Sequence, residues 1–433
     1  MNCATPQALD ALQGRAAPTF PAMVERPSFI HPPRHPPPPD RTIYGTSWDN
    51  HIETAHFTIQ WWSDSVSESQ ARASAEALEM GWQAFIEEQG WKPPVSSDSH
   101  YIWVLLDPDL GSTTGYTTEY VDSNYPEGLP VIYLNPTTLR DFGEPFYTSL
   151  CVHELMHAIQ YGTRDYSWAD DSSDTENWYW EASATHASEL ADPSVDGHQY
   201  ASAWYADQPH LRYDSYVGSH QYGMFVFNAW LDEHHGAGTM QAVWTQAESM
   251  SGTPWPDIIE ATTGSTAAQS WAGFTHAYGN EQMEESDLYG PVTTEGALED
   301  GSQGRLDQLG THYWTVSADV VVTPDSDDII LAGALEPGAS VRTHASTRLS
   351  VTALNDGTKY ALSVSLPGSA GDTGASSGSD EPQEDDNSER TPSGETGAGS
   401  KSSGCHTVEN GARSAPWVLL GLASFALGLR RRA

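Results

Sequence analysis

The pattern of apolar positions predicts strands and helices along the first two thirds of the chain. Short runs rich in aromatic and β-branched residues predict strands at residues 56–62, 101–106 and 128–136. Apolar residues at helical spacing predict helices at residues 68–88, 145–161, 177–190, 221–235, 240–250 and 266–278. Because the strands come early and most of the helices follow them, we expect an α+β domain over about residues 42–290.

The pattern changes after about residue 300. Five short apolar runs, separated by Gly, Pro, Asn and Asp, predict strands at residues 312–317, 319–324, 328–335, 348–354 and 360–366. We therefore expect a small all-β domain resembling a sandwich over residues 300–367. This segment contains few residues typical of catalysis or metal binding, so we interpret it as an accessory module.

Composition separates both ends of the chain from its folded part. Residues 1–41 are rich in Pro, are predicted to be disordered and show no apolar region typical of a signal peptide. Residues 368–404 form an acidic linker rich in Gly and Ser, which cannot bury a core. Residues 405–433 contain an apolar, uncharged stretch followed by three arginines, a pattern typical of a sorting or membrane-anchor segment.

Charge and cysteine content exclude some classes of function. The 433-residue chain has 59 acidic residues against 19 Lys and Arg, a formal net charge of −40, so we expect no binding to nucleic acid. Its three cysteines provide no disulfide framework, and we interpret Cys151 as a small buried hydrophobic residue. The acidic runs at residues 165–174 and 324–328 do not match a calcium-binding loop and are interpreted as solvated loops. We expect a monomer.

The sequence CVHELMHAIQYG contains the main candidate for chemistry. In the predicted helix, which Pro145 can begin and Gly162 can follow, His153 and His157 lie four positions apart and therefore on one face. The apolar residues around them predict that this helix is buried, and buried polar side chains need partners. A cation shared by both imidazoles would be such a partner. The alternative is that the two histidines are core residues and that Glu154 is exposed.

A catalytic zinc site usually takes three protein ligands, so a third residue is required. Three carboxylates compete for this place. Asp165 follows the second histidine too closely for a separate element to fold back, and Glu176 already suits a capping role at the start of the next helix. Glu181 comes 24 residues after the second histidine, next to tryptophans and small residues that favour burial. Because a buried carboxylate needs a cation, we favour Glu181 as the third ligand.

These residues resemble the site of gluzincin metallopeptidases. The shared residues are His153, Glu154 and His157 of H-E-x-x-H, together with Glu181 in the downstream W-E-A-S-A. The chain also resembles metalloproteases that carry a C-terminal sorting tail of the MYXO-CTERM type, which here would comprise Gly404-Cys405, the apolar stretch and the terminal arginines. The resemblance implies a zincin-like fold and a zinc-dependent endopeptidase. It also implies export, processing near Cys405, contact with membrane or sorting machinery, and display at the cell surface.

The resemblance assigns a role to each residue of the motif. His153, His157 and Glu181 would hold Zn²⁺, which lowers the pKa of a water molecule and polarises the scissile carbonyl. Glu154 would act as the general base, taking the proton from water and passing it to the leaving amine. Two alternatives stay open: a catalytically inactive surface adhesin that keeps the fold, and a zinc hydrolase acting on something other than peptide.

Other residues are candidates for supporting roles. Gluzincins commonly stabilise the oxyanion with a Tyr or His from a later helix, and this sequence offers Tyr222, which we favour, and His220. His186 and Glu189 are candidates for contacts behind the ligands. A protein or peptide substrate would bind by β-augmentation along an edge strand, and the strand at residues 128–136 is the one that we expect to serve.

Overall fold

The computed structural model of the protein describes residues 48–367, except for 49, 112, 121–127, 164–176, 195–199 and 335. The predicted N-terminal segment at residues 1–41, the linker at 368–404 and the sorting tail at 405–433 lie outside the described residues. Two other candidates, Asp165 and Glu176, also lie outside them.

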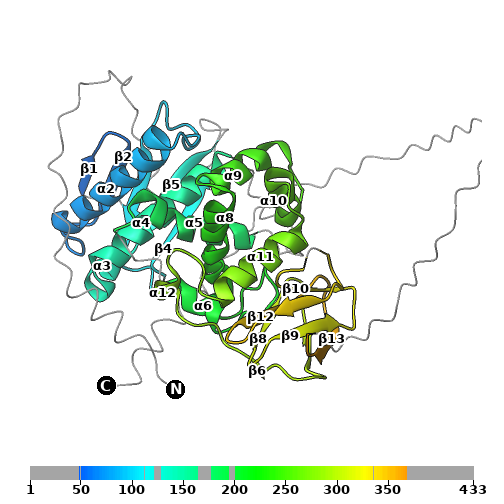
Figure 1. Ribbon diagram of the computed structural model, residues 1–433. Helices are drawn as coiled ribbons and strands as arrows, with labels where there is room; N and C mark the ends of the chain where they lie inside the picture. Colours follow the sequence, from blue (N-terminus) through cyan, green and yellow to red (C-terminus); the bar gives the residue numbers. More distant parts are fainter. Residues whose placement is uncertain are drawn as a thin grey trace, which may run out of the picture.

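The described residues up to about 290 contain one sheet and a series of helices (Figure 1). The strands are β1 (Asn50–Glu53), β2 (Phe57–Trp61), β3 (Ile102–Leu106), β4 (Gly115–Tyr120) and β5 (Leu129–Leu134). The helices are α2 (Glu68–Trp82), which continues as the π-helix η1 (Gln83–Glu88), α3 (Thr137–Phe142), α4 (Glu144–Tyr161), α5 (Asn177–Ala191), α6 (Ser202–Ala206), the 3₁₀ turn η4 (Val217–Ser219), α7 (His220–Gly223), α8 (Phe225–His235), α9 (Thr239–Ser249), α10 (Trp255–Thr263), α11 (Ala267–Gly279) and α12 (Ser286–Tyr289).

The sheet is mixed, in the order β1-β2-β3-β5-β4. β2, β3 and β5 run parallel, while β1 and β4 are antiparallel to their neighbours. The prediction of an α+β fold is confirmed. The prediction that residues 128–136 form the edge strand is wrong, because β5 lies between β3 and β4 and is buried along its whole length. The edge strand on this side of the sheet is β4, which the sequence reading missed.

Both faces of the sheet are covered, and β3 shows how the sequence achieves this. Ile102, Val104 and Leu106 belong to the main core, which includes the buried faces of α2 and α4. Trp103 and Leu105 point to the opposite face and pack in a second apolar cluster, because successive side chains of a strand alternate in direction. A strand buried on both faces has a continuous apolar sequence rather than an alternating one.

The predicted helix at residues 221–235 is broken into α7 and α8. A Cβ on Gly223 would lie 2.5 Å from the backbone nitrogen of Tyr205 in α6, so glycine at this position lets α6 and α7 approach closely. Just before α7, Gly218 and Ser219 both adopt left-handed backbone angles, with φ of 62° and 69°. These turns change the direction of the chain, and α7 then packs against α5 and α6.

The described residues from Gly296 onward form two four-stranded sheets, here called the β module. The strands are β6 (Gly296–Ala297), β7 (Gln303–Leu306), β8 (Thr311–Thr315), β9 (Val320–Pro324), β10 (Ile329–Leu331), β11 (Val341–Thr343), β12 (Arg348–Ala353) and β13 (Thr358–Ser365). One sheet has the order β10-β12-β8-β6 and the other β11-β9-β13-β7. Their inward-facing apolar residues form one core, separate from that of the first part of the chain.

The β module packs firmly on the helical part, below α11 in Figure 1. The hydroxyls of Thr275 in α11 and Ser350 in β12 are 2.9 Å apart and buried. Tyr205 of α6 and Tyr313 of β8 are also joined through their buried hydroxyls, at 3.1 Å. Buried polar groups paired in this way fix one relative position of the two parts.

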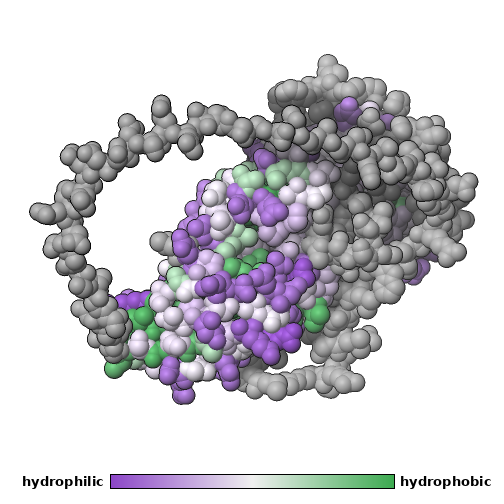
Figure 2. Space-filling view, turned by 90° about the vertical axis from the view of Figure 1, so that its right-hand side faces the viewer, coloured by the Kyte–Doolittle hydropathy of each residue, from purple (hydrophilic) through white to green (hydrophobic). Residues whose placement is uncertain are grey.

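The described surface exposes few large apolar side chains. The face seen in Figure 2 carries hydrophilic residues among residues of intermediate hydropathy, with smaller hydrophobic areas. The large hydrophobic residues that are exposed in the described part of the chain are Tyr216, Val217, Leu288 and Leu366. Among the described helices, none has the length and apolar character needed to cross a membrane.

Candidate metal centre

Helix α4 places the two histidines of the motif. It begins at Glu144, with Pro145 in its first turn, and ends at Tyr161, as the sequence predicts. Gly162 follows it in a right-handed conformation, so a left-handed turn is not the reason for glycine here. A Cβ on Gly162 would lie 3.2 Å from the carbonyl oxygen of Pro93, and this close approach favours the small residue.

The structure brings His153, His157 and Glu181 together. Nε2 of His153 and Nε2 of His157 are 3.0 Å apart. Oε2 of Glu181 lies 3.2 Å from the first of these nitrogens and 3.4 Å from the second. Tetrahedral coordination with bonds of about 2.1 Å places its ligand atoms about 3.4 Å apart. The three atoms therefore form a triangle of the size that a metal ion such as zinc requires, and they could hold one.

The surroundings of Glu181 support the same conclusion. Its side chain is only 15% exposed, and Oε2 accepts no hydrogen bond of good geometry from the described residues. A buried carboxylate oxygen without a donor is costly unless a cation faces it. Burial by itself would raise the pKa of Glu181, but His157 and His153 lower it well below its usual range. The carboxylate is therefore ionised and available as a ligand.

The pKa of His157 is shifted in the opposite direction, because the carboxylate of Glu181 favours its protonated form. Burial lowers its pKa, but the carboxylate of Glu181 outweighs burial and raises the pKa of His157 to about 9. An imidazole must be neutral to bind a metal, so a proton would leave His157 when an ion enters the site. We expect metal binding to weaken as pH falls, because protons then compete with the ion.

Glu154 lies in the same cavity as the three ligand residues and is 3% exposed. Its Oε2 accepts a hydrogen bond of 2.8 Å from the hydroxyl of Thr117 in β4. A Cβ on Gly115 would lie 3.0 Å from Oε1 of Glu154, so the glycine of the edge strand makes room for this carboxylate. Burial raises the pKa of Glu154, while His157 and His153 lower it less strongly. A carboxylate with a raised pKa is a better proton acceptor near neutral pH.

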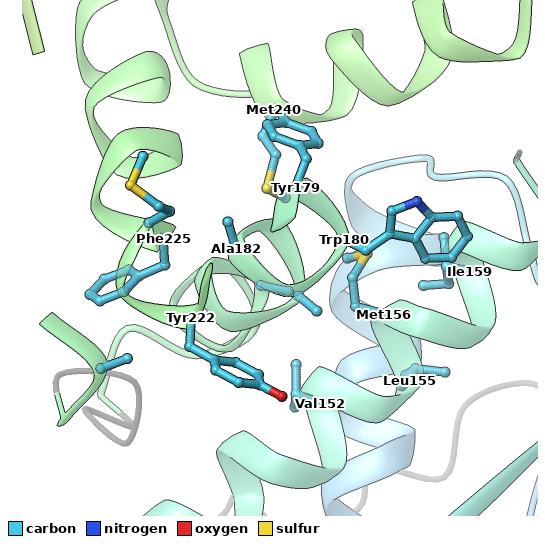
Figure 3. Packing of buried hydrophobic residues seen from close by; sticks show 14 of the residues in the cluster. Val152, Leu155, Met156, Ile159, Tyr179, Trp180, Ala182, Tyr222, Phe225 and Met240 are labelled. Atoms are coloured by element: carbon cyan, nitrogen blue, oxygen red, sulfur yellow. The ribbon is translucent and has the colours of Figure 1, made fainter. Parts of the chain in front are cut away.

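The structure separates the two candidates for stabilising an oxyanion. Tyr222 lines the cavity, and its ring centroid is 6.0 Å from that of His153. Figure 3 shows its side chain pointing from its own helix toward α4. Burial raises the pKa of Tyr222 well above its usual value, so its hydroxyl keeps a proton to donate. His220 is 1% exposed but is not among the residues that line the cavity.

The cavity itself has a volume of about 120 Å³ and lies between α4, α5, the edge strand β4 and the α6–α7 segment. Besides the residues named above, its walls include several aromatic side chains, namely Tyr116, Phe146, Tyr161, Trp180, Tyr200 and Trp204. Reacting groups in such a site would be partly shielded from water, and this strengthens electrostatic interactions within it.

The remaining sequence candidates lie elsewhere or play other parts. His186 contacts Asp232 of α8, with 3.2 Å between Nε2 and Oδ2, and neither it nor Glu189 lines the cavity. Cys151 is buried, as predicted, and burial raises the pKa of its thiol. Sequence reasoning missed Gln160, which is fully buried and whose Oε1 lies 2.7 Å from Nδ1 of His157. The sequence feature that could have indicated Gln160 was a polar residue one turn beyond the motif in an otherwise apolar helix.

Comparison of this chain with protein families and with curated proteins finds no match. Its function is therefore inferred from its own sequence and from the geometry of the described residues.

Proposed function

We propose that this protein is a zinc-dependent endopeptidase with a gluzincin-type site on a zincin-like domain. The observation that carries the proposal is the triangle of ligand atoms from His153, His157 and Glu181, with Glu154 in the same cavity. Two histidines and one carboxylate are a donor set typical of catalytic zinc, in which three protein ligands leave one position open. A zinc ion held there would lower the pKa of a water molecule and polarise a carbonyl group.

The residues of this chain would perform the proton transfers. Glu154 takes a proton from the attacking water on its carboxylate and delivers it to the nitrogen of the leaving amine, while the peptide C–N bond breaks. The Thr117 hydroxyl holds Oε2 of Glu154 in place between these steps. Tyr222 donates a hydrogen bond to the oxygen that gains negative charge in the transition state. Water is consumed, and one carboxylate and one amine are released.

The substrate would lie along β4. This strand contributes Gly115 and Thr117 to the cavity wall, and it pairs with β5 on one side only in the described sheet. An edge strand can bind an extended peptide through main-chain hydrogen bonds. A peptide bound in this way would lie beside the ligand residues, which supports a peptide rather than a compact small molecule as substrate.

The test uses the purified 433-residue chain with casein as an unfolded substrate. We expect about one zinc per chain, cleavage of casein, loss of cleavage with a chelator and recovery with Zn²⁺. Glu154→Gln should lower turnover by about 10³-fold and keep the metal, because Glu154 is a base and not a ligand. Bound zinc without cleavage of casein or of a peptide library would favour an inactive binding protein. Hydrolysis of esters alone would favour a non-peptide substrate.

We also propose that the protein is exported and displayed at the cell surface. The support is the sequence of residues 405–433, with Gly404-Cys405 before an apolar stretch and terminal arginines. Cys405→Ser should leave casein cleavage unchanged and reduce labelling of the protein at the surface of its native cell. Unchanged surface labelling would contradict this proposal without affecting the proposed activity.

A further inference from the structure

Gln160 is placed to control one ligand of the metal centre. It lies one turn after His157 in α4, and its Oε1 is 2.7 Å from Nδ1 of that histidine. Its Nε2 donates two hydrogen bonds, to the carbonyl oxygen of Trp180 at 3.2 Å and to Oγ of Ser183 at 3.0 Å. Since the amide nitrogen has acceptors on its side, the amide oxygen must face His157.

The partners of Ser183 fix the direction of this network. The Ser183 hydroxyl has one proton, which it can donate to the carbonyl oxygen of Tyr179 at 2.5 Å. Its oxygen then accepts hydrogen bonds from Gln160 and from Nε1 of Trp244, the latter at 3.1 Å. Gln160 and Ser183 are fully buried, so water does not compete for these positions. The amide of Gln160 therefore has one favourable orientation.

This orientation determines the state of His157. Because Oε1 of Gln160 can only accept, Nδ1 of a neutral His157 must carry the hydrogen, and Nε2 must carry the lone pair. That lone pair faces Nε2 of His153 and Oε2 of Glu181. The contact behind His153 is weaker, since its Nδ1 lies 3.5 Å from the hydroxyl of Thr185. Of the two imidazoles, His157 is the one held more closely.

The same amide connects the two helices that carry the ligands. Trp180, whose carbonyl it contacts, immediately precedes Glu181 in α5. Met156 and Ile159 of α4 and Trp180 of α5 belong to one buried apolar cluster, part of which is seen in Figure 3. We propose that Gln160 is a positioning residue of the metal centre: by accepting from Nδ1–H of His157, it leaves the lone pair of Nε2 for the metal. This inference rests on the metal site of the proposed function and not on the proteolytic activity.

The test measures affinity for Co²⁺, followed by its visible absorption spectrum, in the purified 433-residue chain. Gln160→Met keeps the size of the side chain and removes the acceptor, so the dissociation constant should rise by about 10–100-fold. Gln160→Glu keeps an acceptor for Nδ1–H and should stay within about threefold of the unmodified chain. The matched control is Gln60→Met in β2, a buried glutamine outside the cavity, which should leave affinity unchanged.

The two variants at position 160 separate ligand positioning from simple helix packing. Gln160→Glu loses both donated hydrogen bonds, so a purely structural role predicts that it loses as much metal affinity as Gln160→Met. That result would overturn the proposal, and so would unchanged affinity in a folded Gln160→Met chain. If Gln160→Met does not fold, Gln160→Asn replaces it. Its amide is one methylene too short to reach His157, and it should weaken binding by about 10-fold; unchanged affinity would again overturn the proposal.

Failure of this inference can be told apart from failure of the proposed function. A chain that binds Co²⁺ with the expected pattern among the variants but cleaves nothing contradicts the endopeptidase and supports the role of Gln160. A chain that cleaves casein with equal metal affinity in all variants supports the endopeptidase and contradicts the role of Gln160. An unmodified chain that binds no metal overturns both.

Discussion

The hydroxyl of Thr117 lies 2.8 Å from Oε2 of Glu154 and 2.8 Å from the backbone carbonyl oxygen of the same residue. A hydroxyl has one proton, so it donates to one of these acceptors at a time. Thr117 belongs to β4, the edge strand, and Glu154 to α4, the ligand helix. The proposed general base is thus joined directly to the proposed substrate-binding strand.

Thr117→Val should slow cleavage at neutral pH by about 10-fold without loss of metal. The hydroxyl stabilises the ionised form of Glu154, so its removal raises the pKa of that carboxyl further. The acid limb of the pH profile of kcat/KM should therefore move to higher pH. Thr117→Ser, which keeps the hydroxyl, is the control and should retain the original profile. An unmoved acid limb in the valine variant would show that Thr117 does not act on the base.

Glu181→Ala should weaken metal binding by at least about 100-fold, because it removes one of three ligands. Equilibrium dialysis against Zn²⁺ measures this directly. The comparison is Asp165→Ala, which tests the competing candidate from the sequence and should leave affinity unchanged. If Asp165→Ala loses the metal and Glu181→Ala keeps it, the third ligand has been wrongly assigned.

Tyr222→Phe should lower kcat by about 100-fold and leave metal content and KM nearly unchanged, as expected for a donor used only in the transition state. Tyr147→Phe is the matched control. Tyr147 is also buried, and its hydroxyl lies 2.8 Å from that of Ser74, outside the cavity. This control should lose about 1 kcal/mol of stability without any loss of kcat. Equal loss of kcat in both variants would argue against a catalytic role for Tyr222.

A fourth prediction concerns stability and pH. Nδ1 of His56 is 2.7 Å from Oε2 of Glu79, and the imidazole stacks on Trp82 with 4.0 Å between ring centroids. Burial alone would raise the pKa of Glu79, but the hydrogen bond and charge of His56 lower it overall. A carboxyl whose pKa is lower in the folded state stabilises the protein above its unfolded pKa, about 4.3, and this contribution is lost as pH falls through the folded value.

Glu79→Met should therefore lower the free energy of unfolding by about 1–2 kcal/mol at pH 7, with a difference that shrinks below about pH 4. Urea unfolding at a series of pH values measures it. Glu76→Met, at an exposed position of the same helix, is the control and should change stability by less than about 0.5 kcal/mol at any pH. A difference that stays constant down to pH 3 would exclude a contribution from the charge of Glu79.

The sequence predicted the elements best where one residue pattern dominated. The bounds of α4 follow from Pro145 and Gly162, and the approach of Glu181 follows from its distance along the chain and its bulky and small neighbours. These signals are local. The boundaries of the predicted domains and the zinc-dependent activity remain predictions.

What the sequence did not reveal depended on contacts between distant segments. β4 was missed because its sequence, GYTTEY, has little apolar character, and its position at the edge is set by pairing with β5. The unbroken apolar run of β5 was a sign of an interior strand and was misread. The break before α8 directly follows Gly223, at the point where α7 approaches Tyr205 of α6, a contact that no local pattern contains.

The hydroxyl contact between Tyr205 and Tyr313 spans 108 residues of sequence, and it affects the order in which the parts of the chain fold during synthesis. A ribosome releases the N-terminal part of a chain first, and that part begins to fold first. Helices α4 and α5, which carry the metal ligands, would be complete before Tyr313 is synthesised. Until then, α6, which packs against the helix of Tyr222, would lack Tyr313, the buried partner of its Tyr205. We expect a growing chain to acquire its metal before its full activity. The proposed endopeptidase, assembled in that order, would have little opportunity to cut its own unfinished chain.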